Sequence, residues 1–161
     1  MADSIQLYLL RHADAGDPDA WQADDAARPL SPKGRRQAEK LGRHLAAVGF
    51  EPDAIITSPK LRAAETATLV AEALGRDVTT DQRLASAVGL DTLGAVIGDV
   101  GTPGKAVLVG HDPDFSDLLS ALVGADVSMK KGAIARIDLT DGPRPGGGTL
   151  RWLLPPDLVP D

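Results

Sequence analysis

The sequence predicts an α/β fold of three layers, in which helices cover both faces of a mostly parallel sheet. Short apolar runs, typical of strands buried on both faces, alternate along the chain with segments of helical periodicity. Serine-proline pairs and single glycines mark the ends of several of these segments. With 161 residues, the chain is expected to form one domain over residues 1–154 and a loosely held tail over residues 155–161.

The first half of the chain contains two strand–helix units. Ser31-Pro32 and Ser58-Pro59 each place a capping serine before a proline at the first helical position. Gly49 and Gly75 are typical of the residues that follow a helix. The predicted elements are a strand over 5–10, a helix over 32–48, a strand over 53–57 and a helix over 59–74.

The second half continues this alternation and ends in a predicted hairpin. A Gly- and Pro-rich turn over 142–148 separates the last two strands, and Gly124 ends the helix that begins at Asp112-Pro113. The predicted elements are a strand near 77–80, a helix near 91–100, a strand over 105–109, a helix over 112–123 and strands over 133–139 and 149–154.

Composition excludes several classes of function. The chain has no cysteine, and its three histidines lack metal-ligand spacing, so we expect no metal site and no disulfide. A net charge of −6 and an aromatic content of 3% argue against nucleic-acid binding. No apolar segment is long enough to span a membrane, and no secretory leader is visible. We therefore expect a cytoplasmic monomer that binds no membrane.

Histidines and arginines follow three of the predicted strands. Arg11 and His12 come directly after the first strand, Ser58 and Arg62 after the second, and His111 after the last strand before the hairpin. Because the carboxyl ends of parallel strands meet at one edge of a sheet, we expect these side chains to converge. Guanidinium groups bind phosphoryl oxygens through paired hydrogen bonds, and imidazole is a good nucleophile near neutral pH. The sequence therefore predicts a site that binds a phosphoryl group and exchanges it with an imidazole.

Three motifs at these positions resemble those of the histidine phosphatase superfamily, which has the phosphoglycerate mutase-like fold. They are Arg11-His12, with Ala13 where the family has glycine, Ser58-Pro59 followed by Arg62-Ala63 and Thr66, and Gly110-His111. Within the superfamily the chain most resembles the SixA-like branch of small phosphohistidine phosphatases. This resemblance rests on the short length, the opening Arg-His-Ala-Asp-Ala, the segment Arg28-Pro29-Leu30-Ser31 and the strand beginning at Ala133. The chain has no large cap insertion, so we expect an open cleft.

The resemblance implies a role for each of these residues. His12 would be the nucleophile and would form a phosphohistidine that water then hydrolyses, without a metal or any other cofactor. Arg11, Arg62 and His111 would bind the phosphoryl oxygens, and His111 would also stabilise charge in the transition state. Ser58 would cap its helix first and contact the phosphate second.

The proton donor of the larger members of the superfamily has no clear counterpart here. They take a carboxylic acid from the segment that corresponds to residues 77–104, which contains Asp81, Asp91 and Asp99 but no glutamate. Asp14 is the alternative donor, and a role as a loop cap is equally open for it. A missing acid penalises alkyl esters, whose leaving oxygen needs a proton, more than phosphoramidates.

Three functions stay open. The leading hypothesis is a metal-independent phosphatase that acts on phosphohistidine in a partner protein. The second is a monoesterase for a small phosphate-containing metabolite, with Asp14 or an aspartate of 77–104 as the acid. The third is a non-catalytic phosphate-binding module, against which the intact set of two histidines and two arginines argues. A phosphoglycerate mutase is disfavoured by the short chain and the missing glutamate.

Structural roles are expected for other charged residues. Arg28 should pair with Asp24 or Asp25 and brace a loop. Lys130 and Lys131 should form a solvated turn, with a place at the border of the cleft as the alternative.

Overall fold

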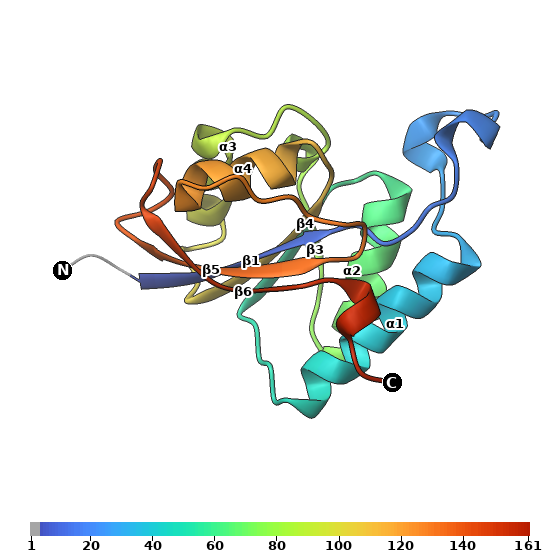
Figure 1. Cartoon of the computed structure of the whole chain (residues 1–161), viewed down its shortest axis with the longest axis horizontal. Helices are drawn as coiled ribbons and strands as arrows, with labels where there is room; N and C mark the ends of the chain where they lie inside the picture. Colours follow the sequence, from blue (N-terminus) through green and yellow to red (C-terminus); the bar gives the residue numbers. More distant parts are fainter. Residues whose placement is uncertain (1–3) are drawn as a thin grey trace.

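A computed structural model describes residues 4–161, and within them a six-stranded mixed sheet lies between two pairs of helices (Figure 1). The strand order is β3-β2-β4-β1-β5-β6. Strands β1 to β4 are parallel, and β5 and β6 form an antiparallel edge. The predicted α/β fold with a mostly parallel sheet is confirmed. The strands are β1 (Ser4–Arg11), β2 (Ala54–Thr57), β3 (Thr79–Thr80), β4 (Lys105–Gly110), β5 (Ile134–Thr140) and β6 (Gly148–Leu154).

Two helices cover each face of the sheet. Helices α1 and α2 lie together on one face, and α3 and α4 lie on the other (Figure 1). Side chains of β1 alternate between the two faces, since Leu7 and Leu9 belong to one apolar core and Tyr8 and Leu10 to the other. Within residues 4–161 no helix has the length and apolar character to cross a membrane. The helices are α1 (Pro32–Ala47), α2 (Leu61–Leu74), α3 (Leu90–Asp99) and α4 (Asp114–Val123).

The pairing of β1 with β4 brings two histidines to the same edge of the sheet. The strands are parallel, and their register pairs Arg11 with Gly110. His12 and His111 are the residues that follow these two. The backbone N–H of His12 donates to the carbonyl of Gly110 at 2.9 Å, which extends the register by one residue. The predicted convergence at the carboxyl ends of the strands is therefore observed for both histidines.

The beginning of α2 differs from the prediction. Lys60 occupies the N-cap position and makes no side-chain cap, so the expectation that Ser58 caps this helix is wrong. Ser58 lies two residues before that position, and its Oγ is bonded to Nε2 of His111 at 2.7 Å. The same Oγ accepts the N–H of Lys60 at 3.2 Å. The hydroxyl of Ser58 thus orients His111 instead of capping α2.

The loop that follows β1 is held close to the beginning of α1. Ser31 caps α1 as predicted, since its Oγ accepts the N–H of Gly34 at 3.0 Å. The N–H of Ser31 donates to the carbonyl of Asp14 at 3.0 Å. A Cβ on Gly34 would collide with that carbonyl, so a glycine is needed for this close approach.

The segment 155–161, predicted to be a loosely held tail, lies beside α1 (Figure 1). It contains a short 3₁₀ turn at Pro156–Leu158. Val159 is only 4% exposed and belongs to the same apolar cluster as Leu41 of α1. Asp161 forms an ion pair with Lys40 of α1 at 2.8 Å. Apolar burial and one ion pair therefore fix this segment against the helix.

Candidate active site

Two buried histidines face each other at the carboxyl edge of the sheet. The ring centroids of His12 and His111 are 5.3 Å apart, and each residue is 6% exposed. Nδ1 of His12 lies 2.7 Å from the carbonyl oxygen of Ala13. Because a carbonyl oxygen only accepts, Nδ1 carries the proton in this contact. In the neutral ring the lone pair is then on Nε2, which is the atom able to attack an electrophile.

Burial keeps both imidazoles neutral. It lowers the pKa of His12 to about 4, and the positive charges of Arg62 and Arg11 act in the same direction. Burial also lowers the pKa of His111 to about 3, with the charges of His12 and Arg62 adding to the effect. For both histidines burial is the largest cause of the low pKa. At neutral pH the nucleophilic form of His12 is therefore the dominant one.

The lowered pKa of His12 is expected to destabilise the folded protein as the pH falls from 7 to 5. An unfolded histidine, with an ordinary pKa of 6.5, takes up a proton over this range, whereas folded His12, with a pKa of about 4, stays neutral. Protonation thus favours the unfolded chain, and His12 alone should lower the free energy of unfolding by about 2 kcal/mol. Urea unfolding across this pH range checks the prediction. His12→Gln should show a smaller loss, and an equal loss in both proteins would contradict it.

Arg62 comes from the first turn of α2 and is 6% exposed. One terminal nitrogen of its guanidinium donates to the carbonyl of Asp25 at 2.9 Å, and the other pairs with the Asp25 carboxylate at 3.0 Å. Thr66, one helical turn later, donates from Oγ1 to the carbonyl of Arg62 at 2.7 Å and accepts the N–H of Ala13 at 3.1 Å. The threonine of this motif therefore ties the first turn of α2 to the residue after His12.

Arg11, the last residue of β1, is held by a different set of contacts from those of Arg62. Its terminal nitrogen donates to the carbonyl of Met129 at 2.7 Å and lies 3.4 Å from the carboxylate of Asp112. Arg11 is near enough to His12 to disfavour its protonation. The structure thus places both predicted arginines beside His12, each anchored by a different loop.

Asp25 is the residue of this site that the sequence did not single out. Its carboxylate binds Arg28 at 3.1 Å and Arg62 at 3.0 Å. Although its partial burial raises the pKa of Asp25, the bonds and charges of Arg28 and Arg62 hold it below the ordinary value. The predicted pairing of Arg28 with a neighbouring aspartate is confirmed, and the partner is Asp25. The second bond, to Arg62, joins positions 37 residues apart, so only the fold reveals it.

Asp14 makes contacts typical of a loop cap. Its carboxylate accepts the hydroxyl of Ser31 at 2.6 Å and the N–H of Gly16 at 3.3 Å. Nζ of Lys131 lies 3.8 Å away. The bond from Ser31 holds the pKa of Asp14 below its usual value, and the bond from Gly16 and the charge of Lys131 contribute. A carboxylate that is ionised at neutral pH must first gain a proton before it can donate one.

Two of the aspartates of the segment 77–104 form ion pairs with an arginine of the same segment. Asp81 and Asp99 both bind the guanidinium of Arg83, each at 2.7 Å. Asp91 lies in the first turn of α3. In the part of the chain that the structure describes, no three His, Cys, Asp or Glu side chains gather at a point that could hold a metal ion.

Three buried nitrogen atoms of the site lack a hydrogen-bond partner within residues 4–161. They are Nε of Arg11, Nε of Arg62 and Nδ1 of His111. Such atoms are rare in folded proteins because burying an unpaired polar group is unfavourable. Their residues come from three separate segments and meet around His12. An anion with several acceptor oxygens, such as a phosphoryl group, satisfies a set of donors of this kind.

Comparisons with known proteins agree with this geometry. The family model of the histidine phosphatase superfamily (branch 1) matches residues 7–88. An uncharacterised protein of Picosynechococcus is 34% identical over 94% of this chain and 100% of its own length. A probable phosphoglycerate mutase, GpmB of Salmonella arizonae, is 34% identical over 50% of this chain, but that match spans only 37% of the mutase.

Solved structures share the fold over nearly the whole chain. The protein histidine phosphatase SixA, complexed with tungstate, superposes with a TM-score of 0.82 at 23% identity, over 95% of this chain and 98% of its own. A mycobacterial glucosyl-3-phosphoglycerate phosphatase superposes with a TM-score of 0.69 at 18% identity, over 92% of this chain and 97% of its own. The fold therefore occurs in phosphatases of proteins and of small metabolites alike.

Proposed function

Since the chain belongs to the histidine phosphatase superfamily, we propose that it removes the phosphoryl group from phosphohistidine side chains of a partner protein. The observation that carries the proposal is the state of His12. Its imidazole is buried, neutral at physiological pH and protonated on Nδ1, with Arg11 and Arg62 beside it. This is the state that nucleophilic attack on phosphorus requires.

The proposed reaction has two displacements at phosphorus. In the first, Nε2 of His12 attacks, a new P–N bond forms, and the P–N bond of the substrate breaks while its leaving imidazole takes a proton from solvent. In the second, water attacks the phosphorylated His12, the P–Nε2 bond breaks, and inorganic phosphate leaves with the proton of the water. The first step therefore leaves His12 phosphorylated on Nε2, and the second returns the electron pair to Nε2 and restores its neutral ring.

Arg11, Arg62 and His111 would bind the phosphoryl oxygens during both steps. Lys60 N–H already donates to the Oγ of Ser58, so the hydroxyl hydrogen of Ser58 is free to point to Nε2 of His111. His111 would then carry its own proton on Nδ1 and donate it to a phosphoryl oxygen. Ser58 has no direct contact with phosphate in this scheme, and it sets the tautomer of His111.

Asp25 would give way to the phosphoryl group. Its carboxylate occupies one face of the Arg62 guanidinium, and a phosphoryl oxygen would compete for the same N–H groups. The side chain of Asp25 is 54% exposed and can turn toward solvent. Arg28, which also holds Asp25, would keep the displaced carboxylate from leaving the site altogether.

The leaving group decides between the two enzymatic functions. Asp14 is held ionised by Ser31, and Asp81 and Asp99 are bound to Arg83. Without a carboxylic acid at the scissile bond, an alkoxide leaves slowly, whereas the nitrogen of a phosphoramidate is protonated by water. This favours phosphohistidine. The partial match to GpmB supports a small monoester as the second candidate, and Asp25 is then the carboxylate nearest to Arg62.

A comparison of substrates tests the proposal. We expect kcat/KM for a phosphohistidine peptide to exceed that for glycerol phosphate by roughly a hundredfold or more, because only the ester needs an acid. We also propose that the protein acts in the cytoplasm. The reaction is proposed to need no metal, so EDTA should leave both rates unchanged. Phosphate release measured with both substrates, with and without EDTA, gives the answer. A faster monoester would move the function to a metabolite, and no turnover of any substrate would indicate a binding module.

A further inference from the structure

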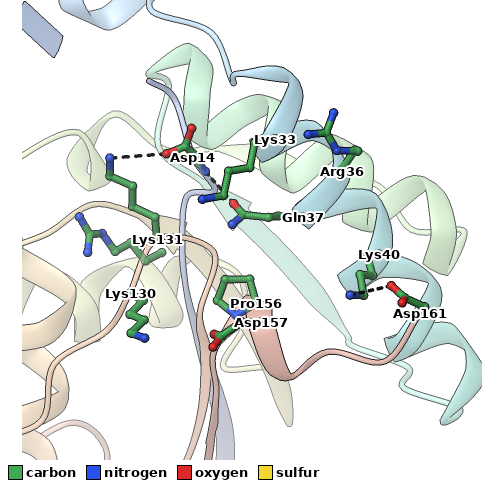
Figure 2. Close-up of a pocket in the computed structure, with 11 residues that line it drawn as sticks. Asp14, Lys33, Arg36, Gln37, Lys40, Lys130, Lys131, Pro156, Asp157 and Asp161 are labelled. Atoms are coloured by element: carbon green, nitrogen blue, oxygen red, sulfur yellow. Dashed lines mark hydrogen bonds and ion pairs between the residues drawn. The ribbon is translucent and has the colours of Figure 1, made fainter. Parts of the chain in front are cut away.

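A cleft lies beside the candidate active site. It has a volume of about 720 Å³ and runs between α1, the turn before β5 and the segment 155–161 (Figure 2). Arg11 and Asp14, the neighbours of His12 in the sequence, form one end of it. The backbone N–H of Gly132, the residue after Lys131, donates to the carbonyl of His12 at 2.9 Å, so the turn that lines the cleft is bonded to the backbone of His12.

Positive charge dominates the wall of this cleft. Six cationic and three acidic side chains line it, although the whole chain carries a net charge of −6. The cationic residues are Arg11, Lys33, Arg36, Lys40, Lys130 and Lys131. Among the ion pairs within residues 4–161, none involves Lys33, Arg36 or Lys130. A concentration of unpaired cations on an acidic protein attracts anions to this face.

The cationic side chains follow one stripe of α1. Lys33 and Lys40 each lie three or four residues from Arg36 and Gln37, and all four line the cleft (Figure 2). The stripe extends for about 10 Å along the helix, at a rise of about 1.5 Å per residue. One phosphoryl group is much shorter than this. The length therefore suits a chain of anionic groups rather than a single anion.

An acidic segment of the protein itself occupies the far end of the cleft. Asp157 and Asp161 line the cleft, and the carboxylate of Asp161 lies against α1, where it binds Lys40 at 2.8 Å (Figure 2). The hydrogen bond from Lys40, together with its charge, holds the pKa of Asp161 below its ordinary value. Acidic polypeptide therefore already fits against this stripe of α1, with aspartate as the residue that pairs with its cations.

We propose that this cleft binds an acidic segment of the protein that carries the phosphohistidine. The inference rests on the proposed function and names the kind of partner that the site accepts. Acidic side chains next to the phosphorylated histidine would lie along Lys33, Arg36 and Lys130, while the phosphoryl group reaches His12. Arg11 lies where the two sites meet. Turnover would then depend on the sequence around the substrate histidine, and added salt would weaken it.

Binding of unphosphorylated peptides tests the cleft without relying on the reaction. A fluorescent peptide with aspartates around a central histidine is compared with one in which serines replace the aspartates. The cleft variant combines Lys33→Gln, Arg36→Gln and Lys130→Gln. The matched control combines Arg76→Gln, Lys105→Gln and Arg144→Gln, which removes three positive charges elsewhere. We expect the cleft variant to bind the acidic peptide about tenfold more weakly and the control to bind it as the wild type does.

Kinetics with the same three proteins separates this inference from the proposed function. The cleft variant should lose kcat/KM for an acidic phosphohistidine peptide through KM, and keep its rate on a small aryl phosphate. Acidic-peptide binding without phosphohistidine turnover would support the cleft and overturn the proposed function. Equal binding of both peptides, or an equal loss in both triple variants, would overturn the cleft. Displacement by inorganic phosphate as strong as that by unlabelled peptide, or tighter binding of a single-stranded oligonucleotide, would overturn it as well.

Discussion

Replacement of His12 by alanine is expected to lower kcat for an aryl phosphate by roughly ten-thousandfold or more, because it removes the group that accepts the phosphoryl group in the proposed reaction. The other side chains that we propose to bind the phosphoryl group, Arg11, Arg62 and His111, would remain. Substrate would therefore still bind, and the loss should appear in kcat rather than in KM. Phosphate release under saturating substrate measures it.

The control for this variant is His44→Ala. His44 lies in the last turn of α1, outside the contacts of the site, and its removal should leave the rate unchanged. Quenching the reaction in alkaline detergent should trap a phosphorylated wild-type protein, and no label should appear on the His12→Ala protein. Retention of a substantial rate by His12→Ala would rule out the covalent route through this residue.

The backbone of the site could be predicted because its signals are local. Apolar runs end at Arg11 and at Gly110, and a parallel arrangement of the two strands is enough to bring His12 and His111 together. The Ser-Pro pair at Ser31 predicted the beginning of α1 for the same reason, since the cap and the helix are adjacent in the chain. Such features depend on neighbouring residues, which sequence patterns record directly.

The pairwise contacts could not be predicted, because they depend on tertiary distances. Ser58 has the sequence of a helix cap, but His111 competes for its hydroxyl from 53 residues away. Asp25 binds Arg62 across 37 residues, and nothing in the spacing favours it over Asp24. The same holds for Lys130 and Lys131, which line a cleft only because the turn before β5 packs opposite α1. Contacts between residues this far apart in the sequence become visible only in the folded structure.

His12 is kept neutral by two effects that respond differently to salt. The charges of Arg62 and Arg11 disfavour protonation of His12, and their effect weakens in salt. The structure adds desolvation, which salt does not screen, as the larger cause of the low pKa of His12. The nucleophile should therefore stay neutral at high ionic strength, whereas the docking of an acidic partner should not survive it.

The replacement of Arg62 by lysine is expected to lower kcat/KM by roughly a hundredfold to a thousandfold, even though the positive charge is kept. A guanidinium presents parallel N–H groups, and Arg62 uses two of its nitrogens on Asp25 in the absence of substrate. An ammonium group offers a single nitrogen and cannot bind two phosphoryl oxygens in the same plane.

Arg35→Lys is the matched control for this change. Arg35 forms an ion pair with Glu65 at 3.1 Å, and its side chain is about half exposed. A lysine can replace this contact with little loss of stability. If charge alone bound the phosphoryl group, Arg62→Lys and Arg35→Lys would be equally active. If the fork of the guanidinium matters, only Arg62→Lys will lose rate, and inorganic phosphate will also inhibit it more weakly. Inorganic phosphate has no leaving group, so its inhibition constant measures only how tightly the phosphoryl oxygens bind. The constant therefore tests the role of Arg62 separately from protonation of the leaving group, the step in which esters differ from phosphoramidates.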